Sequence, residues 1–176
     1  MAWFAALSMA AVAFGAQAAP AADEWKTYRY PQDRFAADFP IPPTPQDQKP
    51  DPQRMVRHNQ YWSDKGDTAF GVSAALFHHK IIASETPDKH LQGVIERVRT
   101  SLECAIRNQR EVSFPGAKAR EVVFEKCQKI DGGVAKQRMF LAGDWLYQVM
   151  MLSSKLGAED NADTKRFLQS FSITAR

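Results

Sequence analysis

The stretch from Ala135 to Leu152, AKQRMFLAGDWLYQVMML, contains two runs rich in bulky side chains on either side of a turn signal. That signal is Ala142-Gly143-Asp144, and glycine and aspartate favour reversal of the chain. Each flanking run has the length of a typical strand. The stretch therefore predicts an antiparallel hairpin with arms at 135–141 and 145–152.

Similar turn signals separate further strands on both sides of this hairpin. They are Asp131-Gly132-Gly133, Pro115-Gly116 and a polar pentad at 63–67. The strands expected from them are 25–30, 34–39, 55–62, 68–77, 111–114, 119–127 and 171–174. Because sequence neighbours are joined by short turns, these strands predict a mainly antiparallel sheet.

The turn at 63–67 also predicts a register for its hairpin. Residue numbers paired across it should add up to about 130, which places His58 opposite Val72. Apolar residues alternate along the second arm, at Phe70, Val72, Ala74 and Leu76, and small residues occupy its other face. The alternation indicates one core-facing side.

An amphipathic helix is expected after that hairpin. Thr86-Pro87 fits an N-cap followed by proline in the first turn. Apolar residues then recur at helical spacing, at Leu91, Val94, Ile95, Val98, Leu102, Ala105 and Ile106. This stripe predicts a helix that reaches Ile106, with Val98 at its buried centre. A second helix is expected at about 161–170, where acidic residues near its start complement the helix dipole.

Proline sets apart the segment from Pro40 to Pro52, which holds six of the ten prolines. Proline lacks the amide donor that a sheet ladder needs, so an extended surface loop is expected. A plain crossover is the preferred interpretation of this loop, and a proline-motif docking site is the alternative.

The N-terminus predicts export. Residues 2–13 form an apolar run of signal-peptide length, and Ala16-Gln17-Ala18 supplies the small-x-small pattern of a cleavage site. No Lys or Arg precedes Lys26, so the usual basic region is missing. We expect a signal peptide at 1–18, one domain at 19–176, and a periplasmic or secreted protein. A buried N-terminal helix is the alternative.

Charge and hydropathy argue against two classes of partner. The net charge is +3, from 23 basic and 20 acidic residues, with no run of five like charges. Nucleic-acid binding needs a concentrated basic face, so it is not expected. After the leader, no segment approaches the roughly 18 apolar residues of a membrane span.

No metal or cofactor site is expected. The histidines are His58, His78, His79 and His90. In the predicted register, His78 lies six residues beyond the partner of His58, or roughly 20 Å away. His78 and His79 should point to opposite faces of a strand. Sequence motifs for nucleotide binding are absent as well.

No catalytic residue is predicted either. Glu121 and Glu125 share a strand face about 13 Å apart, whereas glycosidase carboxylates lie about 5 to 9.5 Å apart. We therefore interpret them as a solvated edge. The chain has no G-x-S-x-G and no S-x-x-K. Aromatic pairs such as Trp145 and Tyr147 are expected in the core, with a ligand groove as the alternative.

The two cysteines, Cys104 and Cys127, are expected to form a disulfide. On the predicted helix Cys104 lies about 140° from the centre of the apolar stripe. Cys127 lies on the strand face opposite Val122 and Phe124. Free thiols outside the core of an exported protein are open to oxidation. The alternative is two separated, inert thiols.

The order of these elements resembles a known family. The features are Phe-x-x-x-Phe-Pro at 35–40, the Pro115-Gly116 turn, the aromatic hairpin at 140–147 and Phe-Leu-x-Ser-Phe at 167–171. They resemble bacterial periplasmic proteins of unknown function that are similar to the PsbP/Mog1-like superfamily. The resemblance implies an α+β fold, a three-layer α-β-α sandwich around a mainly antiparallel sheet. It implies an accessory or binding role and assigns no functional residue.

Three functions follow from this sequence. The first is an exported non-catalytic accessory or binding protein of the bacterial cell envelope, whose partner is an envelope protein or a small ligand. The second is a small-molecule or lipid binding protein with a pocket beside the sheet. The third is a hydrolase with an unrecognised site. A deep apolar pocket with converging polar groups favours the second, and a Ser-His-Asp cluster favours the third.

Overall fold

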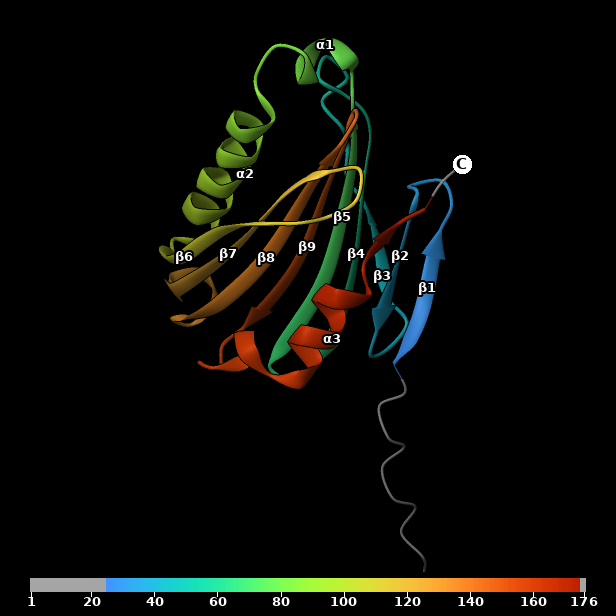
Figure 1. Cartoon of the computed structure of the whole chain (residues 1–176). Helices are drawn as coiled ribbons and strands as arrows, with labels where there is room; N and C mark the ends of the chain where they lie inside the picture. The colour runs from blue at the N-terminus through green and yellow to red at the C-terminus, as the bar shows by residue number, and fades with distance from the viewer. Residues whose placement is uncertain (1–24, 175–176) are drawn as a thin grey trace, which may run out of the picture.

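Two antiparallel sheets and two longer helices make up residues 25–174, the part of the chain that the computed structural model describes (Figure 1). In chain order the elements are β1 (Lys26–Tyr30), β2 (Phe35–Phe39), β3 (Thr44–Asp47), β4 (Met55–Lys65), β5 (Thr68–Phe77), α1 (His79–Ile82), α2 (Pro87–Leu102), β6 (Ala105–Val112), β7 (Lys118–Cys127), η1 (Gln128–Ile130), β8 (Gly133–Ala142), β9 (Trp145–Ser153), η2 (Ala158–Asp160), α3 (Ala162–Ser170) and β10 (Ser172–Ile173). The predicted signal peptide lies outside these residues.

The larger sheet has seven strands in the order β3-β4-β5-β9-β8-β7-β6, and every neighbouring pair is antiparallel. The predicted hairpin β8–β9 forms its centre with β5. In the hairpin β4–β5, however, β4 extends three residues into the expected pentad turn, to Lys65, while β5 begins at Thr68 as expected, and only Gly66-Asp67 lie between them. His58 therefore pairs with Ala75 rather than with the predicted Val72. Gly66 permits the tighter turn because its φ is 60°.

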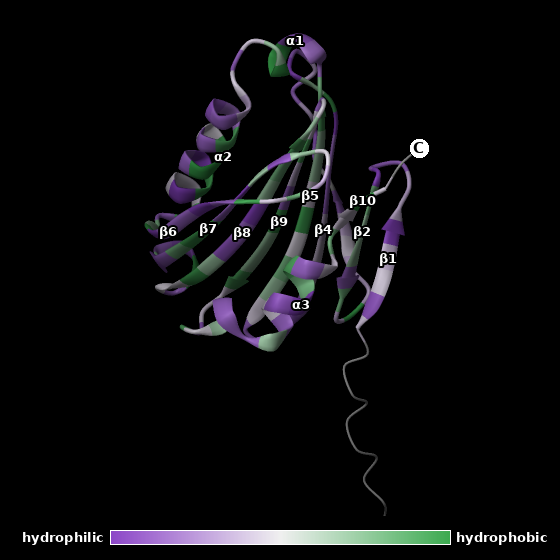
Figure 2. Ribbon diagram, in the orientation of Figure 1, coloured by the Kyte–Doolittle hydropathy of each residue, from purple (hydrophilic) through white to green (hydrophobic). Residues whose placement is uncertain are grey.

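The two faces of this sheet are covered differently. On one face α2 packs over β7 and β8. On the other face lie α3 and the small sheet β1-β2-β10 (Figure 1). The helix α2 turns its hydrophobic side toward the sheet (Figure 2). The predicted α+β fold with three layers around an antiparallel sheet is confirmed, and the third layer contains a sheet as well as a helix.

The main core lies between the large sheet and the layer of α3. Its largest fully buried side chains include Phe35, Phe70, Tyr147 and Phe167. Phe35 and Tyr147 contact each other edge to face, with ring centroids 6.3 Å apart. Such aromatic contacts have a preferred geometry and stabilise the core beyond the burial of their apolar area.

The helix α2 is shorter than the apolar stripe predicted. It begins as expected, with the hydroxyl of Thr86 accepting from the amide of Lys89 at 3.3 Å. It ends at Leu102 because Glu103 adopts the left-handed conformation, with φ 52°. Ala105 and Ile106, predicted in the helix, are the first residues of β6 instead.

The proline-rich segment contains a strand that the sequence did not predict. Thr44–Asp47 forms β3, which pairs with β4 at the edge of the sheet. Pro45 is tolerated there because an edge strand needs only one of its two sides for pairing. The expectation of an unpaired loop was therefore wrong for these four residues.

Cys104 and Cys127 form the expected disulfide, with a Cα–Cα distance of 4.1 Å. The expectation that they lie away from the core was wrong, since they are only 8% and 0% exposed. The helix ends before Cys104 is reached. A β-bulge between Phe124 and Cys127 adds a residue, and Cys127 thereby joins Phe124 in the core beneath α2.

Candidate binding groove

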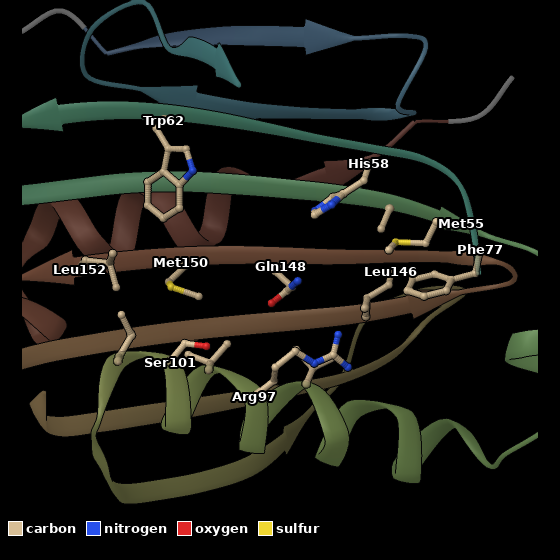
Figure 3. Close-up of a pocket in the computed structure, with 14 residues that line it drawn as sticks. Met55, His58, Trp62, Phe77, Arg97, Ser101, Leu146, Gln148, Met150 and Leu152 are labelled. Atoms are coloured by element: carbon tan, nitrogen blue, oxygen red, sulfur yellow. The ribbon is translucent and has the colours of Figure 1, made fainter. Parts of the chain in front are cut away.

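A groove between α2 and the large sheet is the candidate functional site. A helix is about 10 Å wide and strands lie about 4.8 Å apart, so one helix covers roughly two strands. Because α2 lies over β7 and β8, the same face of β4, β5 and β9 is not covered by it. There the structure contains a cavity of about 280 Å³, lined mainly by apolar side chains (Figure 3).

Small side chains occupy the groove side of β5, and one of them, Ala75, lines the cavity. Ala69, Gly71, Ser73 and Ala75 alternate along the strand and face the side of α2. They are the small residues that the sequence pattern placed opposite the core-facing set. The neighbouring strand β9 presents longer side chains on the same face, namely Leu146, Gln148, Met150 and Leu152.

Trp62 of β4 forms a wall of the groove. Its indole lies directly over Gly71, where an added Cβ would be 2.5 Å from the ring carbons. Glycine at this position therefore allows the ring to lie close to the strand. The indole Nε1 donates to Oε1 of Gln60 at 3.2 Å, which fixes the ring's orientation.

The opposite wall is one face of α2. Val94, Arg97, Val98, Ser101 and Leu102 follow the spacing that places helical residues side by side. The predicted burial of Val98 at the centre of the helix was wrong, because this residue faces the groove and is half-buried. The fully buried positions are Leu91 and Ile95.

Two hydrogen-bonded pairs supply polar groups to the floor. Nε2 of His58 lies 3.0 Å from Oγ of Ser73. Burial lowers the pKa of His58 below its ordinary value, so its ring is neutral at pH 7. Nε2 of Gln137 donates to Oε1 of Gln148 at 2.8 Å.

The His58–Ser73 pair resembles two members of a hydrolytic triad. A third member, a carboxylate on the imidazole, orients the base in such enzymes. Within residues 25–174, the ring of His58 contacts Ser73 and Gln60 and no carboxylate. We assign this pair to cross-strand stabilisation of the groove floor.

The other three histidines lie in or near α1, and each contacts a different partner. His78 contacts the carbonyl of Pro52 at 3.1 Å, His79 contacts Asp144 at 2.9 Å and His90 contacts the carbonyl of Ile82 at 3.0 Å. Among the described residues, no three His, Cys, Asp or Glu side chains come together as a metal site would require. Nor is any helix of residues 25–174 long and apolar enough to span a bilayer.

Glu121 does not lie on a solvated edge, contrary to the sequence-based interpretation. Its side chain is 4% exposed and lies between Arg110 and Arg138, at 2.7 and 2.6 Å. Burial opposes ionisation, but the two guanidinium groups outweigh it and lower the pKa of Glu121. The arginines stabilise this carboxylate on the sheet face away from the groove.

The aromatic residues divide between the two faces of the sheet. Trp145 and Tyr147 stack with ring centroids 5.7 Å apart and belong to the main core, as expected. Tyr61 also packs on that side, where its ring centroid lies 3.8 Å from that of Tyr30. Trp62 and Phe77 lie on the other face and line the groove. The signal that could have found the groove was this tryptophan opposite the small face of the next strand.

No protein-family model matches the chain, and no curated protein matches it in sequence. Among the solved structures that match is the solution structure of cyanobacterial PsbP (CyanoP) from Synechocystis sp. PCC 6803. The identity is 11%, the match covers 91% of this chain and 98% of that chain, and the TM-score is 0.57. The chain therefore has a PsbP-like fold, as the resemblance in sequence implied. At this identity the likeness concerns the fold alone.

Proposed function

We propose that this chain is an exported, non-catalytic binding protein of the bacterial cell envelope that holds the apolar part of a small ligand in the groove between α2 and the sheet. The observation that carries the proposal is the cavity of about 280 Å³ over Ala75 of β5, between α2 and β9. Of the three functions expected from the sequence, this is the binding protein with a pocket beside the sheet, in the accessory role that the family resemblance implies.

The physical basis of the proposal is the apolar surface of the groove. Met55, Trp62 and Phe77 line it together with aliphatic side chains of α2 and β9. Transfer of apolar surface out of water contributes roughly 25 cal/mol per Å², so a ligand that covers these side chains is stabilised. Ligand sites are usually concave and apolar with few polar groups, which describes this groove.

Two features support export. The first is the signal-peptide pattern at 1–18, which lies outside the described residues. The second is the bond between Cys104 and Cys127, since disulfides persist in oxidising compartments such as the periplasm. The bond ties the chain just after α2, which forms one wall of the groove, to the end of β7.

Filling the groove should abolish binding. The neutral dye N-phenyl-1-naphthylamine should bind the wild-type protein with increased fluorescence. Ala75→Leu adds three heavy atoms to the floor of the cavity and should weaken dye binding by at least about tenfold, or 1.4 kcal/mol. Fluorescence titration measures the difference, and circular dichroism verifies that the variant folds.

The matched control is Ala83→Leu, the same change at an exposed residue after α1. It should leave dye binding unchanged. Equal affinity of the wild type and Ala75→Leu, or no dye binding to the wild type, contradicts the proposed function.

If the chain is exported, its signal peptide should be removed. Expressed with its own leader in a Gram-negative host, the protein should appear in the periplasmic fraction with Ala19 at or near its N-terminus. N-terminal sequencing of the purified material measures this. Intact Met1 on cytoplasmic material is the result that rules out the predicted leader.

A further inference from the structure

We propose that the ligand of the groove is a single-chain amphiphile with an anionic head, and that Arg97 and Gln148 bind that head. This inference rests on the proposed function and goes further by naming the chemical class of the ligand. It follows from the charge of the groove, from the direction of its free donors and from the size of its cavity.

Arg97 is the first of these donors. It lies on the face of α2 that lines the groove, and Figure 3 shows its side chain on the groove side, across from β9. Other cations of the same helix have acidic partners: Arg99 contacts Glu96 at 2.7 Å and Lys89 contacts Glu85 at 2.9 Å. Within residues 25–174, Arg97 has no ion pair or hydrogen bond.

Gln148 is the second donor, and its amide is held in one orientation. Its Oε1 is used by Gln137, which is fully buried. This leaves Nε2 of Gln148 without a hydrogen bond in the described part of the chain, and Figure 3 shows the side chain in the middle of the groove floor. A fixed donor needs little ordering when it binds an acceptor.

The charge of the lining favours an anion. Among the described residues that form the groove there is no Asp or Glu, and His58 is neutral at pH 7. A carboxylate that enters thus meets a guanidinium and an amide donor without a repelling charge in the lining. Guanidinium and carboxylate groups match in geometry and form charge-assisted hydrogen bonds.

The size of the cavity favours a single chain. Its volume of about 280 Å³ is just below the roughly 300 to 1,000 Å³ of ligand pockets. Apolar side chains lie on both sides of Gln148 along β9, at Leu146, Met150 and Leu152. One alkyl chain can lie along them, whereas a lipid with two acyl chains exceeds the cavity.

The test compares decanoate with decanol, which share a chain length and differ in the charge of the head. Both are titrated below their aggregation limit against bound N-phenyl-1-naphthylamine at low ionic strength. For the wild type, decanoate should displace the dye at a concentration about tenfold lower than decanol, because the guanidinium and amide donors form charge-assisted hydrogen bonds with the carboxylate. Arg97→Gln should reduce this preference to about twofold or less.

Arg99→Gln is the matched control, because Arg99 is an exposed arginine of the same helix that does not line the groove. It should retain the tenfold preference. If decanol and decanoate displace the dye equally from the wild type, or neither displaces it, the anionic ligand is wrong while the groove remains a binding site. An equal loss of preference in Arg99→Gln also overturns the role of Arg97. If the dye itself does not bind, the proposed function fails instead.

Discussion

Ile95→Asp is expected to lower the free energy of unfolding by at least about 4 kcal/mol. Ile95 is 0% exposed and packs in the cluster between α2 and the sheet, together with Leu91 and Phe124. A carboxylate at this position is removed from water among apolar side chains. Since domains of this size are stable by about 5 to 15 kcal/mol, the substitution should remove a large share of the total stability. Chemical denaturation followed by circular dichroism measures the loss.

Val98→Asp is the control for this prediction. Val98 lies one turn further along α2, is half-buried and faces the groove, where water reaches the new carboxylate. The substitution should lower the free energy of unfolding by about 1 to 2 kcal/mol, as is typical at a partly exposed position. Equal losses for the two variants, or a larger loss at Val98, would falsify the assignment of the buried face of α2. If Ile95→Asp does not fold at all, Ile95→Ala, with an expected cost of about 2 to 5 kcal/mol, replaces it in the comparison.

Removal of the disulfide should lower the free energy of unfolding by about 3 kcal/mol. The bond closes a loop between residues 23 positions apart and joins the chain just after α2 to the end of β7. In the unfolded chain it restricts the separation of these two segments, and that restriction is lost in Cys104→Ala/Cys127→Ala. The measurement is the denaturation midpoint of the variant against that of the wild type.

A reductant provides the control for the disulfide prediction. It should lower the midpoint of the wild type toward that of the double variant and leave the double variant unchanged. Alkylation of the denatured protein without reductant should modify neither cysteine. If both cysteines take up the reagent under those conditions, the bond is absent from the purified protein.

The groove exists because the helix layer is narrower than the sheet that it covers. One face of a seven-stranded sheet is covered by a single helix of 16 residues. Leu91, Val94 and Ile95 bury one side of that helix, and its neighbouring side is left to line the cavity. The other face of the sheet is closed by α3 and the small sheet, so its aromatic side chains form a packed core. The same sheet thus provides a core on one side and a binding surface on the other.

Local signals in the sequence by themselves determined the class of the fold and most of its elements. The turn residues at 142–144 and 131–133 predicted the hairpins around β8, and Thr86-Pro87 predicted the first turn of α2. These elements are predictable because their causes lie within a few residues: turn chemistry, capping and the alternation of side chains along a strand. The pairing of Cys104 with Cys127 was predicted from their even number and from the expected export of the chain.

Only the tertiary structure decided which faces are buried, how the strands are registered and where the site lies. The bulge before Cys127 and the left-handed Glu103 reversed the expected exposure of both cysteines. The pairing of β5 with β9, which joins Val72 to Val149 across the sequence, brought the small face of β5 beside Gln148, on the part of the sheet that α2 leaves uncovered. Whether the space above a small side chain is filled by packing or left as a cavity depends on residues that are distant in the sequence. That is a property of long-range packing, which no local pattern of residues contains.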